Sequence, residues 1–278
     1  SIIGEEFPAE VIAHVLDERP QPVIHRLSDI LTHRYRLLTS AGVRRLRTQR
    51  LSQYKFQHIL FQNYLYETMD ESERSYLHEA VGNTMEAMYA EDEDLLSATA
   101  VQLAHHFQKA DLPVKTVPYL LLAGKRAMHL SAYENAIAHF EQGLALLFLL
   151  PPHAERDHQE VELLVALGNA LVCARGTALT VVGDTFRRVL ALTERSADHA
   201  QQALALFNLW RHYSDRADYQ QCDDIAGQLR RLAEQSDNPA VHLTADHALW
   251  TMSLYAGDFG RARYHAEQGI AWYRPALH

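Results

Sequence analysis

The sequence predicts an all-α protein built from stacked helix pairs, preceded by a small N-terminal module that carries a β-hairpin. Apolar residues recur at helical spacing almost without interruption from His58 to the end of the chain. Aromatic residues that mark tight turns, Tyr133, Tyr219 and Phe259, are separated by 86 and 40 residues, which indicates a structural repeat of about 40–43 residues. Only 12 of the 278 residues are glycine and 9 are proline, a composition typical of long helices.

Residues 1–69 are expected to form a winged-helix-like module. Two short helices are predicted over residues 7–16 and 22–32, separated by Arg19-Pro20-Gln21-Pro22. The period then changes to the alternation that is typical of a hairpin. A turn is expected at residues 40–42 and two strands at residues 43–48 and 53–56, joined by residues 49–52.

A helix over residues 58–69 ends this module, and residues 70–112 are predicted to be a helical connector with helices over 71–89 and 94–110. All three helices carry apolar residues at helical spacing. These residues are Ile59, Leu60, Tyr64 and Leu65, then Leu77, Val81, Met85 and Met88, then Leu96, Val101, Ala104 and Phe107. We expect the last helix to begin at its acidic residues and to bury its apolar set.

The first helix pair, residues 117–150, has small residues where two helices would cross. One stripe is formed by Leu120, Ala123, Gly124 and Ala127, and after a turn at Ala132-Tyr133 the second helix carries Ala136, Phe140 and Gly143. This is the tetratricopeptide pattern. Three further pairs follow, with turns near Gly176, Tyr219 and Phe259. We therefore expect residues 113–278 to form about four tetratricopeptide-like pairs in a right-handed superhelix.

The first helix of each pair would line an inner groove. Counting along the repeats places seven residues toward it: Lys125, His129, Asn169, Phe207, Arg211, His247 and Thr251. Such a mixture of polar and aromatic side chains would suit a peptide or a helix of a partner protein. The alternative is that some of these residues only cap neighbouring helices.

Composition limits the class of protein. The net charge of −9 argues against general binding of polyanions, and two cysteines in helical patterns fit a reducing cytosol. No apolar run reaches the ~18 residues that a membrane span needs, and residues 1–10 lack a signal peptide. We expect a cytoplasmic protein with no membrane contact. The first residue is not methionine and the last helix has no polar cap, so the sequence is expected to be a fragment.

A basic segment stands out from this acidic background. Between Ile30 and Tyr66 there is no carboxylate, and there are seven positive charges: Arg34, Arg36, Arg44, Arg45, Arg47, Arg50 and Lys55. This segment could contact another protein module, remain in solvent, or contact the phosphates of a nucleotide or of DNA. One positive hairpin in an acidic chain favours nucleic acid least. His58 follows the hairpin and could sense a phosphate or cap the next helix.

Catalytic and metal-binding patterns are weak. His105 and His106 are adjacent and would face different ways, and His242 and His247 are five residues apart, which is not the spacing of a zinc-binding helix. We nominate no catalytic residue, no metal and no cofactor for this fragment, and we do not expect it to be an enzyme.

Several motifs resemble a known family. They are Tyr54-Lys55-Phe56-Gln57-His58-Ile59-Leu60, Tyr64-Leu65-Tyr66-Glu67, Glu73-Arg74-Ser75-Tyr76-Leu77-His78, the opening Ser1-Ile2-Ile3-Gly4-Glu5-Glu6-Phe7, and Leu103-Ala104-His105-His106. In their order along the chain they resemble the region between the nucleotide-binding module and the repeats of bacterial STAND-type signalling ATPases. That family includes transcriptional regulators of the LuxR and maltose-activator type and proteins that carry a nucleotide cyclase.

The resemblance implies ATP or ADP only for a module that this chain lacks, because no phosphate-binding Gly-x-x-x-x-Gly-Lys-Ser/Thr motif is present. Gln57 also stands where the family usually has arginine. The resemblance favours a regulatory sensor or docking fragment of such an ATPase, which would bind a protein or peptide, its own ATPase module or a small effector. A stand-alone adaptor scaffold and a DNA-binding regulator are the alternatives.

Overall fold

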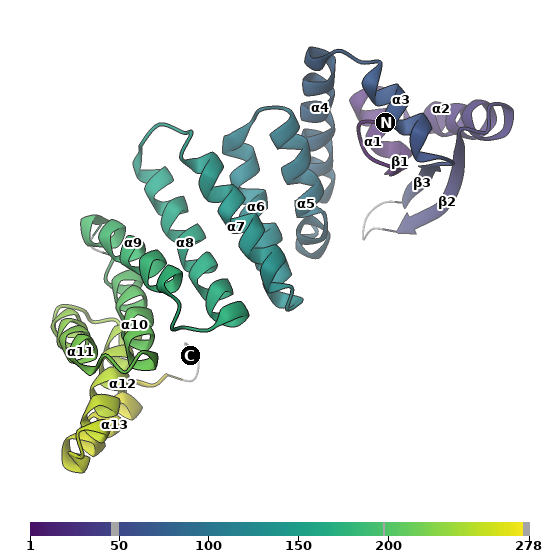
Figure 1. Ribbon diagram of the computed structural model, residues 1–278. Helices are drawn as coiled ribbons and strands as arrows, with labels where there is room; N and C mark the ends of the chain where they lie inside the picture. Colours follow the sequence, from purple (N-terminus) through teal and green to yellow (C-terminus); the bar gives the residue numbers. More distant parts are fainter. Residues whose placement is uncertain (46–49, 197, 275–278) are drawn as a thin grey trace. The chain divides into compact units, whose positions relative to one another are not determined.

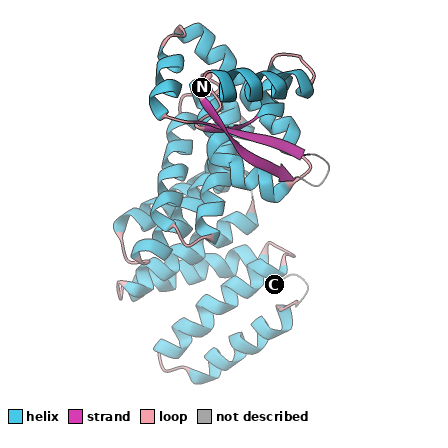
Figure 2. Cartoon of the chain, turned by 90° about the vertical axis from the view of Figure 1, so that its right-hand side faces the viewer, coloured by secondary structure: helices cyan, strands magenta, loops and turns pink. Residues whose placement is uncertain are grey.

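The computed structural model describes residues 1–45, 50–196 and 198–274. Across these residues the chain is mostly helical, with thirteen α-helices, one π-helix and one small antiparallel sheet (Figures 1 and 2). The prediction of a mainly helical chain with a small β element near the N-terminus is confirmed. No helix in the described ranges combines the length and the apolar character that crossing a membrane requires.

The chain divides into two units, Ser1–Arg126 and Ala127–His278. Unit 1 contains β1 (Glu6–Pro8), α1 (Ala9–Val15), α2 (Pro20–His25), η1 (Arg26–Arg34), β2 (Leu38–Arg45), β3 (Arg50–Phe56), α3 (Ile59–Glu67), α4 (Glu71–Tyr89), α5 (Glu93–Lys109) and most of α6 (Pro113–His129). Unit 2 contains α7 (Tyr133–Leu147), α8 (Ala154–Arg175), α9 (Thr180–Ser196), α10 (His199–Asp215), α11 (Tyr219–Glu234), α12 (Pro239–Tyr255) and α13 (Phe259–Trp272). The predicted division at residues 69 and 112 stays a prediction.

The sheet has three strands, with β3 between β1 and β2. β1 pairs Phe7 with Tyr54, and β2 pairs Leu38 with Phe56. These side chains belong to one apolar core together with Ala9, Ala13, Val23 and Leu27. The prediction that a helix begins at residue 7 is therefore wrong by two residues, because the first residues of that segment are held extended by pairing with β3.

The predicted hairpin is present, but its predicted bounds need correction. Residues 40–42 are not a turn: β2 runs through them, and the pairing register shifts between Ser40 and Gly42, whose φ of 96° suits a glycine at an irregular strand position. The predicted connection at residues 49–52 is wrong for its last three residues. β3 already begins at Arg50, since pairing with β2 buries Leu51.

The helices from α4 onward lie close to where the sequence predicts them. In unit 2 each helix from α7 to α13 packs on the next one, and α10 also packs on α12 (Figure 1). One burial prediction in the connector is wrong, because Val101 of α5 is half exposed, whereas Ala104 and Phe107 are buried as expected.

The turns of three helix pairs share one backbone conformation. Ser131, Ala217 and Gly257 have left-handed φ values of 57°, 56° and 76°. Each lies two residues before the turn aromatic that begins the next helix, Tyr133, Tyr219 or Phe259. A left-handed residue ends the first helix and reverses the chain, so the repeated aromatic marks a repeated turn.

Candidate functional site

The predicted groove residues that the structure brings together lie on α10 and α12. Phe207 stacks on Trp210 with ring centroids 5.7 Å apart and planes 11° apart. The edge of His247 meets Phe207 at 5.1 Å, and Trp250 lies 5.5 Å from His247 along α12. We call these four residues the aromatic cluster. Because α10 and α12 pack together, the rings of the two helices contact one another, with Trp210 buried and the other three rings at least partly exposed.

The electrostatics of the aromatic cluster favour a neutral imidazole. Burial, and secondarily the positive charge of Arg211, lower the pKa of His247. The indole Nε1–H of Trp210 is buried and has no acceptor in the described part of the chain. Buried N–H groups normally have a partner, and a partner protein could supply an acceptor to this one only after the surrounding side chains rearrange.

An apolar pocket of about 360 Å³ shares two members with the aromatic cluster. It lies between α12 and α13 and is lined by Leu243, His247, Trp250, Ala266, Gly269, Ile270 and Tyr273. A Cβ added at Gly269 would lie 3.6 Å from Asp246 and from Leu243, an ordinary van der Waals distance, so α13 packs closely on α12 beside the pocket without requiring glycine here. The pocket can hold an apolar or aromatic side chain next to the rings.

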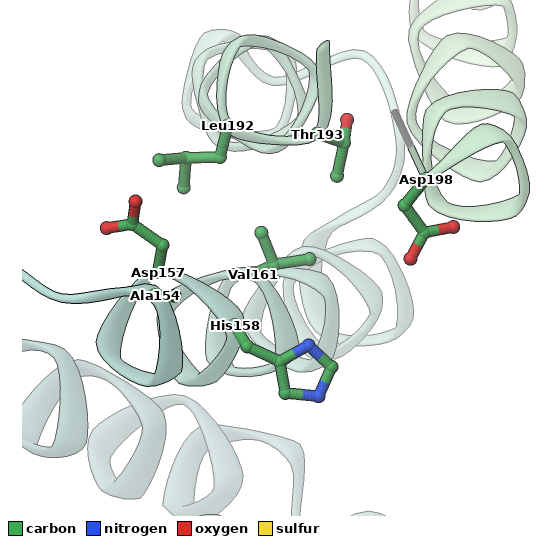
Figure 3. A pocket seen from close by; sticks show the side chains of 7 residues that line it. All are labelled: Ala154, Asp157, His158, Val161, Leu192, Thr193 and Asp198. Carbon is green, nitrogen blue, oxygen red and sulfur yellow. The ribbon is translucent and has the colours of Figure 1, made fainter. Parts of the chain in front are cut away.

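A second pocket of unit 2, of about 310 Å³, has a different character (Figure 3). Asp157 and Asp198 lie at opposite sides of it, with Val161 between them. The rest of its wall is formed by Ala154, His158, Leu192 and Thr193. Asp198 is engaged, because its Oδ1 accepts from the backbone N–H of Gln201 at the start of α10. Nowhere in the described ranges do three or more histidine, cysteine or carboxylate side chains form a group that could hold a metal ion.

The remaining predicted groove residues are placed less favourably. Thr251 is buried and its hydroxyl donates to the His247 carbonyl at 2.9 Å, so it does not line a surface. A helix can return such a hydroxyl to its own preceding turn, which sequence counting cannot distinguish from an outward position. Asn169 of α8 and His129 at the end of α6 are exposed. Lys125 is also exposed, but it belongs to unit 1, where it lines a pocket with Tyr119 and Leu122.

The basic hairpin belongs to unit 1. Near its tip Arg44, Arg45 and Arg50 are exposed, and Arg47 lies outside the described residues. His58 is the N-cap of α3: its Nδ1 accepts from the backbone N–H of Leu60 at 3.2 Å. Its ring meets Phe61 edge-on at 6.4 Å. This is the capping role given above as the alternative to a phosphate contact, which stays a prediction.

Sequence reasoning missed a buried histidine pair in unit 1. His78 of α4 and His106 of α5 approach at 2.9 Å between their Nδ1 atoms, and the Tyr66 hydroxyl lies 3.2 Å from His78 Nε2. Burial, followed by neighbouring positive groups, lowers the pKa of His78 to about 4 and that of His106 to about 3. The adjacent pair His105-His106 was visible in the sequence, but their proximity to His78 depends on how α4 and α5 pack.

Comparisons with known proteins support the helical fold and give no function. No family model matches the chain. An uncharacterised protein of Rhizobium meliloti (strain 1021) is 22% identical over 232 residues, which are 82% of this chain and 22% of that protein's length. The crystal structure of BtubC (BKLC) from P. vanneervenii is 13% identical and has a TM-score of 0.54, covering 74% of this chain and 84% of that one. At this identity the likeness concerns the fold alone, and it agrees with a chain of packed helices.

Proposed function

We propose that this chain is a protein-interaction module of the tetratricopeptide type, which binds a short peptide or a helix of a partner on α10 and α12. The aromatic cluster and the adjoining pocket between α12 and α13 form the binding surface. The partner supplies an apolar or aromatic side chain for the pocket.

The observation that carries this proposal is the aromatic cluster itself. Rings from two successive helix pairs meet next to an apolar pocket, with Phe207, His247 and Trp250 accessible and Trp210 packed beneath them. Large aromatic side chains in a partly desolvated patch contribute most of the energy in many protein interfaces. Arg211 at the edge would favour a partner with a carboxylate near its apolar anchor.

A screen with short random peptides displayed on phage tests the proposal. The intact chain is the bait, and peptides that also bind the Trp250→Ala variant are removed. Recovered peptides are expected to carry an aromatic or large aliphatic anchor, and His247→Ala and Phe207→Ala are expected to weaken their binding by roughly tenfold or more. Phe148→Ala, which alters an exposed ring after α7, is the matched control. Failure to recover such peptides, or equal binding to all variants, would contradict the proposal.

In its wider context we propose that the module is the sensor or docking arm of a STAND-type signalling ATPase. The motif resemblance supports this reading, and Arg44, Arg45 and Arg50 of the hairpin would contact the ATPase module. Binding at α10 and α12 would then bias the packing between arm and ATPase. The test is co-purification of the chain with a matching ATPase module, with and without Arg44→Glu/Arg45→Glu. If the double substitution leaves the association unaffected, the stand-alone adaptor is favoured instead.

A further inference from the structure

The last two helix pairs, α10–α11 and α12–α13, are built in one register. Helices α10 and α12 each span 17 residues, and the residues at which they begin, His199 and Pro239, are 40 positions apart. The turns keep the same interval, because the N-cap Asp218 of α11 corresponds to the N-cap Asp258 of α13. Each residue of α12–α13 can therefore be compared with the residue 40 positions earlier in α10–α11.

The pair α10–α11 shows what covers one face of such a pair. Helix α12 packs on both of its helices (Figure 1). The ring of His247 in α12 lies 5.1 Å from that of Phe207 and 6.2 Å from that of Trp210, between centroids. Eight residues further along α12, the ring of Tyr255 meets Tyr219 of α11 at 5.8 Å. An α-helix that presents two rings eight residues apart therefore covers this face.

The corresponding face of α12–α13 is accessible in the described part of the chain. Positions that are buried in α10–α11 have more exposed counterparts in α12–α13. The buried residues are Ala203, Trp210, Ala226 and Ala233, and their counterparts are Leu243, Trp250, Ala266 and Tyr273. The change is largest at Tyr273, which is 50% exposed, whereas Ala233 is 6% exposed. All four counterparts line the pocket of about 360 Å³, and we call them the α12–α13 face.

A glycine leaves room for the pocket on this face. Leu229 of α11 is fully buried, and its counterpart in α13 is Gly269, which also lines the pocket. Since glycine has no side chain, the volume that Leu229 fills in one pair is left unfilled in the next. A helix that covers the α12–α13 face must therefore bring a large side chain of its own to reach normal packing density.

We propose that the α12–α13 face binds an amphipathic α-helix of a partner protein, which packs on it as α12 packs on α10 and α11. The helix brings one aromatic side chain to the pocket beside His247 and Trp250. It brings a second one, eight residues further along, to Phe259, which is the counterpart of Tyr219 and is 70% exposed. Repeats of this kind contact their neighbours through equivalent faces, which makes a helix the matching occupant.

This inference deepens the function proposed above and rests on it, because it specifies that the occupant of the pocket is a helix and not an extended peptide. A second copy of the chain is a poor occupant. Its own helix with two rings at this spacing, α12, is already packed on α10 and α11.

The direct test uses a synthetic, fluorescein-labelled peptide of about the length of α12, held helical by a hydrocarbon staple. It carries an apolar stripe with two phenylalanines eight residues apart, and equal numbers of glutamates and lysines elsewhere. Fluorescence anisotropy with the intact chain should show saturable binding. An unstapled peptide with the same stripe and two central prolines cannot form the helix and should bind roughly tenfold or more weakly.

Two variants locate the helix on the chain. Ala266→Arg should weaken binding of the stapled peptide by roughly tenfold or more, because the long side chain occupies the position of the helix. Phe259→Ser should weaken it severalfold through loss of the second ring contact, and this exposed position tests the proposal even if Ala266→Arg does not fold. Tyr264→Ser is the matched control: Tyr264 also belongs to α13 and is 56% exposed, but it does not line the pocket.

Three results would overturn the proposal: equal binding of the proline peptide, unchanged affinity in Phe259→Ser and in folded Ala266→Arg, or self-association of the chain that the stapled peptide reverses. The last result would show that a second copy occupies the face. Phage peptides that need Trp250 but bind in an extended form would contradict the helix and leave the proposed function intact, so the two failures are separable.

Discussion

Gly168 lets α8 lie directly against the ring of Phe186 in α9. A Cβ added at Gly168 would lie 2.5 Å from the Phe186 ring, and that ring is fully buried and has no room to move. Gly168→Ala is therefore expected to destabilise the chain by about 1–3 kcal/mol, although alanine is the better helix former. Chemical denaturation of the purified variant measures this change.

Gly227 of α11 supplies the matched comparison. The nearest atom to a Cβ added there is 3.7 Å away, at the flexible end of Arg231. Gly227→Ala should therefore stabilise the chain by about 0.5–1 kcal/mol, because it removes backbone freedom from the unfolded state without a clash. The two glycines should thus give changes of opposite sign, and stabilisation by both substitutions would show that helix propensity, rather than packing, decides these positions.

At the scale of elements, α8 and α9 are joined by a buried carboxylate. Glu160 is 1% exposed and accepts from Arg188 Nε at 2.8 Å, whereas Arg188 is itself half exposed. Arg188→Ala leaves this carboxylate buried without its partner, and we expect a loss of roughly 2–4 kcal/mol of unfolding free energy. Replacing both residues with leucine should recover most of the loss, because no charge then remains buried.

The pair of Arg175 and Glu134, which joins α7 and α8, serves as the control. Both side chains are exposed, so Arg175→Ala should leave the denaturation midpoint almost unchanged. An equally large loss in Arg175→Ala and Arg188→Ala would mean that burial of the carboxylate is not the cause.

Elements were more predictable than the directions in which their side chains point. The helices of the repeats follow from apolar spacing and from the turn aromatics, because each helix must bury one stripe against the next. β1 escaped prediction, since three residues carry no readable period and are extended only through pairing with β3. Helix α3 has the apolar spacing of a core helix, yet its side chains Leu60, Phe61, Tyr64 and Leu65 are exposed. Only tertiary packing, through the hydrogen bonds of Gln62 and Tyr66, decides that they face outward.

The candidate site shows the same division. Phe207, Arg211 and His247 were placed from the period alone, and the structure brings them together. Thr251 fits the same count and yet is buried, because a hydroxyl can bond to its own helix. The unpaired Trp210 Nε1 depends on the packing of α10 against its neighbours, which the period does not specify.

For the molecule as a whole, the histidine pair of unit 1 predicts a response to acid. Burial and the nearby His105, Lys109 and Arg74 disfavour charge on the pair. In the neutral pair one Nδ1 donates to the other, because a contact of 2.9 Å between two ring nitrogens needs one N–H group and one lone pair. Protonation of both rings would put N–H groups on both Nδ1 atoms and break this hydrogen bond.

The pKa values of about 4 and about 3 lie below the ordinary histidine value of 6.5, so the unfolded chain binds more protons at acidic pH. The stability contributed by the pair is complete above pH 6.5 and falls as the pH drops toward those values. Between about pH 7 and pH 5 we expect a loss on the order of 2–4 kcal/mol, treating the pair as one coupled unit.

Hydrogen exchange of the intact chain at both pH values, corrected for the intrinsic exchange rate, should show this loss in α4 and α5 of unit 1. His106→Asn can still present a polar atom to His78 but removes one titrating group, and it should roughly halve the acid response. His129→Asn, at an exposed position, should leave the response unchanged. Equal loss of protection in α8 to α11, or an undiminished response in His106→Asn, would mean that the acid sensitivity has another origin than the pair.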